Sequence, residues 1–268
     1  GHEVGFGRQL VGRMAPVGVG EGPELAAVHE GLQPLLQLLE VGGAADAGVA
    51  DVNGAPAAFI FDLDGTLTDP YEGITRCILY ALDELGFPHP DDDYLYSCIG
   101  PPLWDTFPEL VGQDLTRKAV DLYRERFVEC GWKENVPYDG IHEALETIAA
   151  EGHLLFVATA KPHMHAARIV EHFGMGDFFH NVYGSELDGT RATKTELLRF
   201  AIEKNPGDAA RVMIGDREHD LLGAVANDMT PIGVAWGYGS TEELEEAGAT
   251  AIAGSPGELP GLLASHLR

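Results

Sequence analysis

The stretch AAFIFDLDGTLTDP, residues 57–70, places two carboxylates directly after a short apolar run. The run predicts a buried strand, which Gly65 ends immediately after Asp62 and Asp64. Two negative charges at one strand end repel each other, so they need a bound cation or a proton to be tolerated. We therefore expect a reactive or metal-binding site at this strand end, with partners supplied by the rest of the chain.

Five further apolar runs follow the first, separated by segments of helical periodicity. The six predicted strands are 57–64, 153–160, 181–185, 211–216, 230–237 and 249–254. Between them, Ile141, Leu145 and Ile148 share one helical face, and capping boxes predict helix starts at 193–196 and 240–243. Continuous apolar strands that alternate with helices are typical of a parallel sheet covered on both faces. The expected fold class is α/β, with a Rossmann-like core.

One long segment interrupts this alternation, because residues 72–136 contain no predicted strand. Two apolar stripes at helical spacing predict helices around 74–85 and 115–127. We interpret the segment as an all-α cap inserted after the first strand, where it could hinge over the strand end. The predicted division is an extension at 1–55, an α/β core at 56–71 and 137–268, and a helical cap at 72–136.

The composition limits the classes of partner. The 268 residues include 43 acidic and 17 basic side chains, a formal charge of −26, which argues against nucleic acid and anionic membranes. No apolar run reaches the roughly 20 residues of a spanning helix, and none reads as a signal peptide. Three widely spaced cysteines indicate a reducing compartment. We expect a cytoplasmic monomer or homodimer, with residues 1–55 poorly ordered or derived from an expression vector.

Polar residues follow several predicted strands at ends that meet along one edge of a parallel sheet. In chain order, the side chains expected to converge are Asp62, Asp64, Thr159, Lys161, Lys194, Asp216 and Asp220. Carboxylates without His or Cys among them favour a hard cation, and Mg²⁺ is the natural choice. A threonine hydroxyl and a lysine ammonium group beside that cation would bind phosphoryl oxygens, and Lys161 is either a further phosphate ligand or a loop charge. The set therefore indicates a site for a phosphorylated small molecule.

The two aspartates of the first strand end are predicted to have different roles. Asp62 would attack phosphorus and form an aspartyl phosphate. Asp64 would protonate the leaving alkoxide and then take a proton from the water that hydrolyses the intermediate. Gly65 would let the backbone approach the phosphate closely, with its N–H and that of Leu63 as donors.

These motifs resemble those of the haloacid dehalogenase superfamily of aspartate-nucleophile phosphohydrolases, over about residues 57–265. FDLDGTLTDPYEGI, IGPPL, VATAKP and MIGDREHDLLGA are similar to the phosphoglycolate phosphatase-like branch, which has a helical cap. The resemblance implies the nucleophile and acid/base roles for Asp62 and Asp64. It also implies that Thr159 binds phosphate and that Lys194 stabilises the intermediate. The implied Mg²⁺ ligands are Asp62, Asp216, Asp220 and the main-chain carbonyl of Asp64.

The substrate stays open at the level of the sequence. The leading hypothesis is a Mg²⁺-dependent phosphomonoesterase acting on a small phosphorylated metabolite. The alternatives are a 5′-nucleotidase, a sugar-phosphate mutase and a non-enzymatic phospho-receiver module, although a receiver needs neither a cap nor Asp64. Arg76 and the turn at Gly100 are candidates for selecting the leaving group. A cation there would favour a carboxylate, whereas an aromatic wall from Trp104 or Phe107 would favour a nucleoside.

Overall fold

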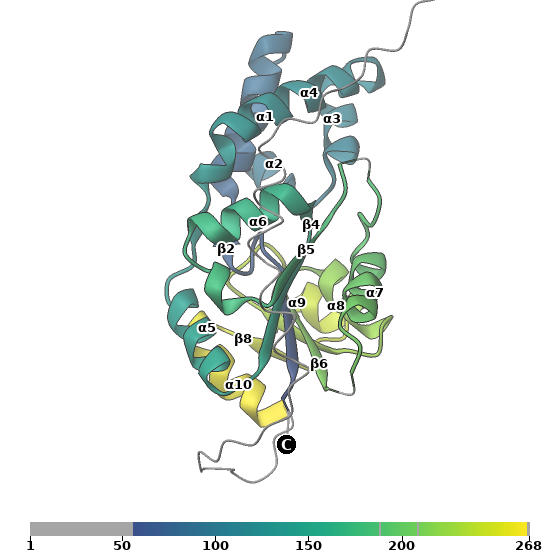
Figure 1. Cartoon of the computed structure of the whole chain (residues 1–268). Helices are drawn as coiled ribbons and strands as arrows, with labels where there is room; N and C mark the ends of the chain where they lie inside the picture. The colour runs from purple at the N-terminus through teal and green to yellow at the C-terminus, as the bar shows by residue number, and fades with distance from the viewer. Residues whose placement is uncertain (1–55, 188, 208, 267–268) are drawn as a thin grey trace, which may run out of the picture. The chain divides into compact units, whose positions relative to one another are not determined.

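The computed structural model describes residues 56–187, 189–207 and 209–266, so the expectations for residues 1–55 lie outside it. Six strands form a parallel sheet in the order β5-β4-β1-β6-β7-β8 (Figure 1). They are β1 (Ala58–Phe61), β4 (Leu154–Pro162), β5 (Asn181–Ser185), β6 (Arg211–Gly215), β7 (Thr230–Val234) and β8 (Ala251–Ala253). Each overlaps a predicted strand, although β1 and β7 end three residues before the predicted limits, and the α/β class with a Rossmann-like core is confirmed.

The first strand lies in the middle of the sheet, where it pairs with β4 on one side and β6 on the other. The register places Phe61 beside both Val157 and Ile214, so the three strands run side by side toward one edge. The order of strands changes direction here, because β4 and β5 extend the sheet one way and β6 to β8 the other. Ligands of open α/β sheets bind beyond such a point. The residues that follow these strands are therefore neighbours in space.

Helices cover both faces of the sheet (Figure 1). One face carries α5 (Ile141–Ala150), α6 (His163–His172) and α10 (Leu259–His266); the other carries α7 (Lys194–Lys204) and α8 (Glu218–Val225), with α9 (Thr241–Glu246) beside α8. Along β1, Phe59 and Phe61 pack in the hydrophobic cluster on the face covered by α5, α6 and α10, and Ile60 packs in the cluster on the face covered by α7 and α8. This alternation is expected for a strand buried on both sides. In the described part of the chain, none of the helices could cross a membrane by length and apolarity.

The two predicted helix starts are present. Thr193 caps α7 by accepting a hydrogen bond from the N–H of Glu196 at 3.3 Å. Ser240 caps α9 in the same way, accepting from the N–H of Glu243 at 3.1 Å. Lys194 is consequently the first residue of α7, at the end of the helix that lies near the strand ends.

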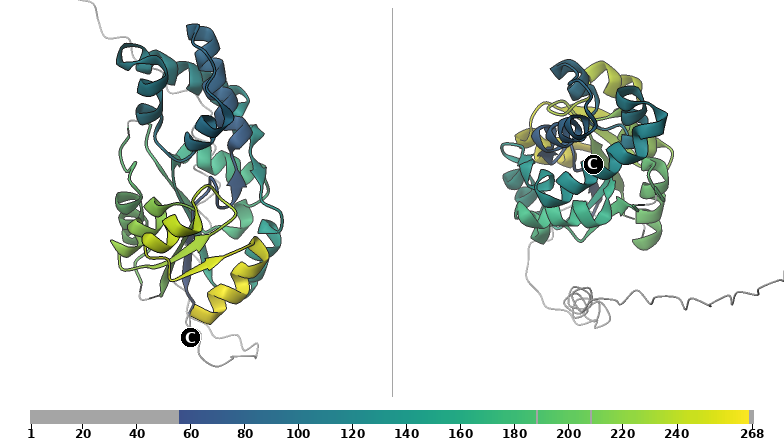
Figure 2. Two further views of the ribbon diagram at one scale, coloured as in Figure 1. Left: turned by 180° about the vertical axis from the view of Figure 1, so that it is seen from behind. Right: turned by 90° about the horizontal axis from the view of Figure 1, so that it is seen from above.

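The segment that follows β1 is mostly helical. It contains α1 (Tyr71–Leu85), α2 (Asp92–Ser97), α3 (Leu103–Val111), α4 (Gln113–Glu129) and the 3-10 helix η1 (Gly131–Glu134). We call residues 71–134 the cap; Figure 2 shows its helices beyond one end of the sheet. The predicted stripes of α1 and α4 are largely buried against each other, as at Ile78 and Ala119. Since core and cap lie in one compact unit, Asp51–Arg268, the division into two domains stays a prediction.

Two short strands at the base of the cap differ from the sequence prediction. β2 (Thr68–Asp69) and β3 (Val136–Pro137) pair in antiparallel fashion, so residue 136 belongs to a strand and not to a strand-free segment. Each strand has two residues, which is too short for an alternating pattern to be recognised. The pair joins the two connections of the cap, and Asn135 adds a hydrogen bond from Nδ2 to Oγ1 of Thr68 at 3.2 Å.

Candidate active site

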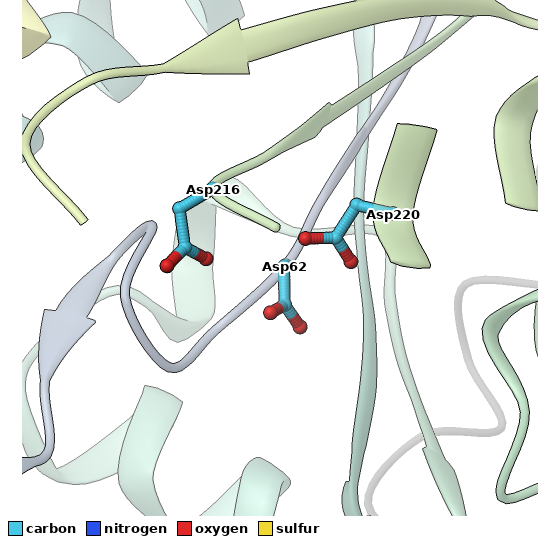
Figure 3. Close-up of side chains that lie close together, drawn as sticks. All are labelled: Asp62, Asp216 and Asp220. Carbon is cyan, nitrogen blue, oxygen red and sulfur yellow. The ribbon is translucent and has the colours of Figure 1, made fainter. Parts of the chain in front are cut away.

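Three carboxylates meet at the edge of the sheet where β1 and β6 end. Asp62 follows β1, Asp216 follows β6, and Asp220 lies in the first turn of α8 (Figure 3). One oxygen from each lies within 4.8 Å of the others, and Figure 3 shows Asp62 between Asp216 and Asp220. Asp216 and Asp220 are almost fully buried, at 0% and 2% exposure. We call these three residues the acidic cluster.

The acidic cluster fits a hard divalent cation. It offers three carboxylate oxygens and neither His nor Cys, which is the donor chemistry that Mg²⁺ prefers. Burial raises the pKa of Asp216, and the charges of Asp220 and Asp62 add to the shift. Burial also raises the pKa of Asp220, although Lys194 opposes this. A bound divalent cation would offset both burial and mutual repulsion by favouring the ionised carboxylates.

Lys194 places a positive charge inside the acidic cluster. Its Nζ donates to Oδ1 of Asp62 at 2.9 Å, to Oδ1 of Asp220 at 2.7 Å and to the carbonyl of Ala158 at 2.8 Å. Burial alone lowers the pKa of this ammonium group, but the neighbouring Asp220 and Asp62 outweigh burial and raise it. Lys194 is therefore a permanent cation next to the predicted nucleophile.

The carboxylate of Asp64 pairs with Lys161 and not with the acidic cluster. Nζ of Lys161 lies 2.9 Å from Oδ2 of Asp64. The other oxygen, Oδ1, is buried and has no hydrogen-bond partner among the described residues. Burial raises the pKa of Asp64, Lys161 opposes the shift, and Asp62 adds to it. A carboxyl group with a raised pKa suits an acid/base role.

Thr159 and Lys161 extend the site along β4. Thr159 is buried, and its Oγ1 accepts the N–H of Lys161 at 3.3 Å, which leaves the hydroxyl proton available for a ligand. Lys161 also reaches the cap, because its Nζ lies 4.7 Å from the centroid of the Phe127 ring. The contacts of Thr159 and Lys161 with phosphate stay predictions.

Gly65 has a different partner from the one predicted. Its N–H donates to the carbonyl of Thr68 at 2.8 Å and closes the turn after β1, so it is not available to a phosphate. The backbone has φ +87°, and a Cβ at this position would lie 2.2 Å from Oδ2 of Asp216. Glycine is required there because of the positive φ and the closeness of Asp216. The predicted contact of phosphate with the N–H of Leu63 stays a prediction.

The two residues proposed to select the leaving group lie in different surroundings. Arg76 on α1 is about half exposed, and its Nη1 pairs with Glu134 at 3.0 Å on the surface of the cap. The structure therefore does not bring Arg76 into the acidic cluster, because an acidic partner within the cap holds its charge. Gly100 lies beside the core, where a Cβ would be 2.9 Å from Nη1 of Arg217. Arg217 directly follows Asp216, so Gly100 is close to the cluster.

The two cap aromatics considered for a nucleoside wall also differ. Phe107 is fully buried, with its ring centroid 6.2 Å from that of Tyr123, and belongs to the core of the cap. Trp104 is exposed, and the guanidinium of Arg124 lies 6.0 Å from its ring centroid. The exposed cap aromatic that contacts the core is instead Tyr96, whose ring centroid lies 4.8 Å from that of Tyr238.

Two residues that hold Asp216 in place were missed from the sequence. Oγ1 of Thr66 donates to Oδ1 of Asp216 at 3.2 Å, and the N–H of Tyr238 donates to Oδ2 at 2.8 Å. Thr66 belongs to the DLDGT motif and could have been identified as a hydroxyl beside the carboxylates. Tyr238 lies in the glycine-rich stretch WGYGS, which indicates a tight loop. A Cβ on Gly237 of that loop would lie 2.3 Å from Cβ of Asp216.

Comparisons with known proteins are consistent with this geometry. Residues 59–234 match the family described as haloacid dehalogenase-like hydrolase. A 5′-nucleotidase of Pseudomonas aeruginosa is 48% identical over 211 residues, covering 77% of this chain and 95% of the relative. The tyrosine-protein kinase PtkA of Mycobacterium tuberculosis is 35% identical over 199 residues, or 74% and 68% of the two chains. A phosphoglycolate phosphatase of Colwellia psychrerythraea is more distant, at 25% over 200 residues, or 70% and 88%.

A solved structure supports the same assignment. The putative phosphatase from Clostridium difficile superimposes with a TM-score of 0.72 at 39% identity, covering 80% of this chain and all of that one. The family match extends from β1 to β7 and includes the whole acidic cluster. The chain therefore belongs to the haloacid dehalogenase-like hydrolases.

Proposed function

We propose that the protein is a Mg²⁺-dependent phosphomonoesterase that hydrolyses a small phosphorylated metabolite through an aspartyl-phosphate intermediate. The observation that carries the proposal is the position of Asp62, in contact with Lys194 and grouped with Asp216 and Asp220. A carboxylate can attack a negatively charged phosphoryl group only where nearby positive charge balances both. Lys194 supplies one such charge, and a divalent cation held by the acidic cluster would supply a second.

The two chemical steps use Asp62 and Asp64 in turn. First, a carboxylate oxygen of Asp62 forms a bond to phosphorus while the bond from phosphorus to the leaving oxygen breaks. Asp64, whose pKa is raised by burial, gives its proton to that leaving oxygen. Second, Asp64 takes a proton from water, the water oxygen attacks phosphorus, and phosphate leaves. This step restores the carboxylate of Asp62.

The surrounding residues bind and orient the phosphoryl group. The Mg²⁺ ligands that we propose are Asp62, Asp216, Asp220 and the main-chain carbonyl of Asp64. A bound Mg²⁺ supplies positive charge next to the phosphoryl oxygens. Lys194 stabilises the negative charge on the phosphorylated aspartate, and the hydroxyl of Thr159 donates to a phosphoryl oxygen. Lys161 gives a further positive charge next to the acid/base carboxyl group.

A panel of phosphate-release assays tests the proposal. The substrates are phosphoglycolate, sugar phosphates, nucleoside monophosphates, pyrophosphate and p-nitrophenyl phosphate, each with Mg²⁺ and compared by kcat/KM. We expect turnover of at least one natural phosphomonoester and of p-nitrophenyl phosphate. A protein that releases phosphate from none of them, yet accepts a phosphoryl group on Asp62, would be a phospho-receiver. A requirement for a sugar bisphosphate primer would indicate a mutase.

A 5′-nucleotidase is the second candidate. It would use the same chemistry on nucleoside monophosphates, a narrower class of substrate. The Pseudomonas aeruginosa relative bears this name. In addition, Tyr96 of the cap is 46% exposed next to the ring of Tyr238, and an exposed aromatic face is a surface on which a nucleobase can stack. This candidate predicts the highest kcat/KM for a nucleoside monophosphate and a lower value for ribose 5-phosphate, which lacks the base.

We further propose that the protein works in the cytoplasm on a small molecule, and not on nucleic acid or a membrane. The formal charge of −26 supports this, because it would repel both polyanions. Cys77, Cys98 and Cys130 are free thiols, in keeping with a reducing compartment. Light scattering coupled to gel filtration would distinguish the monomer from the homodimer.

A further inference from the structure

The cap and the core meet in a polar contact between cap residues 96–100 and the loops after β6 and β7. Nη1 of Arg217, the residue after Asp216, donates to the carbonyl of Ile99 at 3.2 Å. The hydroxyl of Tyr96, at the end of α2, donates to the carbonyl of Gly237 at 3.4 Å. We call Tyr96, Ile99, Gly100, Arg217 and Gly237 the cap latch.

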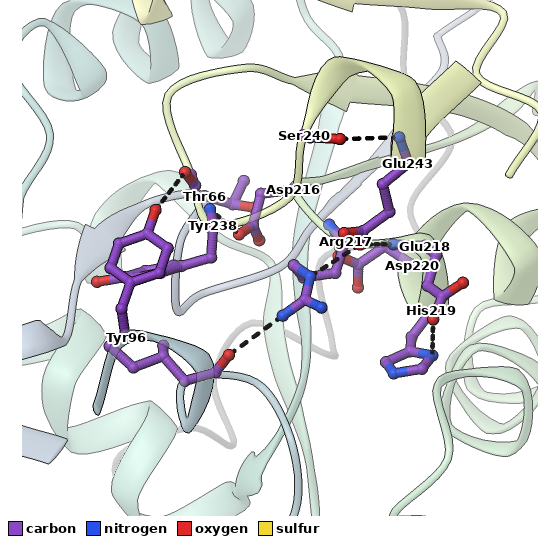
Figure 4. Close-up of polar contacts among 12 residues, drawn as sticks. Thr66, Tyr96, Asp216, Arg217, Glu218, His219, Asp220, Tyr238, Ser240 and Glu243 are labelled. Carbon is purple, nitrogen blue, oxygen red and sulfur yellow. Dashed lines mark hydrogen bonds and ion pairs between the residues drawn. The ribbon is translucent and has the colours of Figure 1, made fainter. Parts of the chain in front are cut away.

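Arg217 is held firmly at its core end. Its Nε donates to Oε1 of Glu243 at 2.8 Å, and the same oxygen accepts the N–H of Glu218 at 2.8 Å. The N–H of Arg217 itself donates to Oδ2 of Asp220 at 3.2 Å. Figure 4 shows the guanidinium between Glu243 and the cap segment that carries Tyr96. The side chain is therefore fixed in one direction, from the loop after β6 toward the cap.

The cap end of the latch is shaped to receive this guanidinium. Gly100 has φ +106°, a conformation that side-chain-bearing residues rarely adopt. A Cβ at Gly100 would lie 2.9 Å from Nη1 of Arg217, closer than a real side chain can approach. Glycine here thus serves two needs, the positive φ of the turn and the room for Arg217.

Both core segments of the latch also hold Asp216. Arg217 is its neighbour in the chain, and the N–H of Tyr238, next to Gly237, donates to its Oδ2 at 2.8 Å. The rings of Tyr238 and Tyr96 are in contact, with centroids 4.8 Å apart. A displacement of the cap at the latch would therefore disturb the surroundings of one member of the acidic cluster.

A second junction of cap and core contains a buried aromatic side chain. Trp132 of η1 is buried, with the guanidinium of Arg168 of α6 at 3.7 Å from its ring centroid and the ring of His172 at 4.9 Å. This junction adjoins β3, where the chain returns to the core. Opening there would expose the buried ring of Trp132, whereas opening at the latch exchanges two hydrogen bonds for water and separates the ring of Tyr96, already 46% exposed, from that of Tyr238. The cap therefore opens more readily at the latch.

We propose that Arg217 is a positioning residue that holds the cap closed over the acidic cluster, so that cap closure and the placement of Asp216 occur together. The kinetic consequences rest on the proposed function, whereas the latch itself does not. A substrate can enter when the latch is open. It is then enclosed when Arg217 binds the carbonyl of Ile99.

Steady-state kinetics of Arg217→Met in the full chain test this role. The variant keeps most of the length of the side chain but removes its donors. KM for the best substrate of the panel should rise about tenfold, the scale of one charge-assisted hydrogen bond. The rise follows because a cap that is closed for a smaller fraction of the time lowers the apparent affinity. We expect kcat to fall less, Arg217→Lys to recover part of the affinity, and Arg117→Met, at an exposed site on α4, to match the wild type.

A second pair of variants leaves Arg217 in place. Gly100→Ala brings a methyl group against Nη1 of Arg217, whereas Gly112→Ala creates comparable strain, at φ +79°, where a Cβ would meet no described atom within 4 Å. We expect Gly100→Ala to raise KM as Arg217→Met does, and Gly112→Ala to retain the wild-type KM. The double variant of Gly100 and Arg217 should raise KM no further than either change alone, because both break the same contact.

Amide hydrogen exchange distinguishes failure of the latch from failure of the proposed function. In Arg217→Met and Gly100→Ala, the amides of residues 96–100 should exchange faster than in the wild type. This difference should appear both in the presence of Mg²⁺ and beryllium fluoride and in their absence. The exchange rates of β1 should not change. If the wild type hydrolyses no phosphomonoester, the proposed function fails and the exchange data still decide on the latch. Wild-type exchange at 96–100 in both variants would overturn it, as would an unchanged KM in both. Should Arg217→Met fail to fold, Gly100→Ala decides.

Discussion

The strand ends of the core and the cap segment opposite them are built in different ways. On the core side, Asp62, Asp220 and Lys194 are buried, and the lysine bonds both carboxylates at 2.9 and 2.7 Å. On the cap side, Tyr96 is 46% exposed, and its hydroxyl reaches the carbonyl of Gly237 at 3.4 Å. The core thus holds its polar groups in a network, whereas the cap touches the core here through single, longer hydrogen bonds and the contact of the Tyr96 ring with Tyr238.

This difference separates the chemistry from the choice of substrate. A buried polar network allows one geometry, because each member loses a partner when it moves. Single contacts at a surface open at little cost in free energy, and such regions are where moving parts of enzymes are found. We therefore expect changes at Asp62, Asp220 or Lys194 to lower kcat for all substrates equally, and changes in the cap to act on KM and on which substrate is preferred.

The largest effect is expected from Asp62→Asn, which tests the core side directly. An amide cannot attack phosphorus, so kcat should fall by about a thousandfold or more for every substrate, as is usual when a nucleophile is removed. Quenched reactions with radiolabelled substrate should trap a phosphorylated protein for the wild type and none for the variant. A rate above a trace in the pure, folded variant, or a trapped phosphate on it, would place the nucleophile elsewhere.

Removal of Mg²⁺ should lower the rate nearly as much as Asp62→Asn does, and by the same factor for every substrate. Activity is expected to disappear on dialysis against EDTA and to return with Mg²⁺, because the acidic cluster needs a cation to offset its repulsion. Independently of turnover, Mg²⁺ should raise the thermal midpoint of the wild type by binding the folded state. Asp216→Asn should reduce that rise. Full activity after exhaustive chelation would exclude the mechanism.

The core side is also the side that the sequence predicts well. Short apolar runs identify the strands, and parallel strands bring their carboxyl ends to one edge, so Asp62 and Asp216 could be placed together from chain order. Lys194 follows a capping threonine, which marks the helix start that brings it there. These predictions rest on local patterns whose geometry repeats in every parallel α/β sheet. They needed no knowledge of how distant segments pack.

The cap side could not be predicted in the same way. A helical stripe indicates which face of α1 is buried, but not that Arg76 would find Glu134, 58 residues away. Arg217 bonds the main-chain carbonyl of Ile99, and a carbonyl has no side-chain pattern to recognise. The N–H of Gly65, which the sequence predicts to bind phosphate, instead donates to the carbonyl of Thr68. This turn could not be predicted because it involves only backbone atoms. Contacts between distant segments, and contacts through the backbone, leave little trace in sequence periodicity.

On the cap side, Tyr96→Phe and Tyr96→Leu distinguish two roles of Tyr96: holding the cap against the core and contacting the substrate. Both remove the hydrogen bond to Gly237, so both should raise KM for all substrates. Only Tyr96→Leu removes the aromatic face. It should therefore lower the kcat/KM of a nucleoside monophosphate relative to ribose 5-phosphate, by about threefold to tenfold, the scale of one aromatic contact. Tyr80→Phe, at another cap tyrosine, is the control for loss of a hydroxyl. If neither change alters the ratio, Tyr96 holds the cap without contacting a base.

The smallest effect is expected at a buried contact between core and cap, and it concerns stability. His165 of α6 is 7% exposed, and its ring centroid lies 5.2 Å from that of Phe127 of α4. Burial lowers the pKa of His165 to about 4, and the positive charges of Lys161, Arg168 and Arg124 contribute to the same shift. The unfolded chain therefore binds a proton at this residue below a pH of about 6.5, whereas the folded chain does not until about pH 4.

Stability contributed in this way is present above about pH 6.5 and is lost as the pH falls toward 4. His165→Gln, which cannot take up the proton, should lose less thermal midpoint between pH 7 and pH 4.5 than the wild type. We expect a difference of a few degrees, given roughly 2–4 °C per kcal/mol for a chain of this size. His163→Gln, at an exposed site on the same helix, is the matched control and should follow the wild type. Parallel pH profiles for wild type and His165→Gln would show that the contact with Phe127 tolerates a charged imidazole. The junction would then be less strictly apolar than its burial implies.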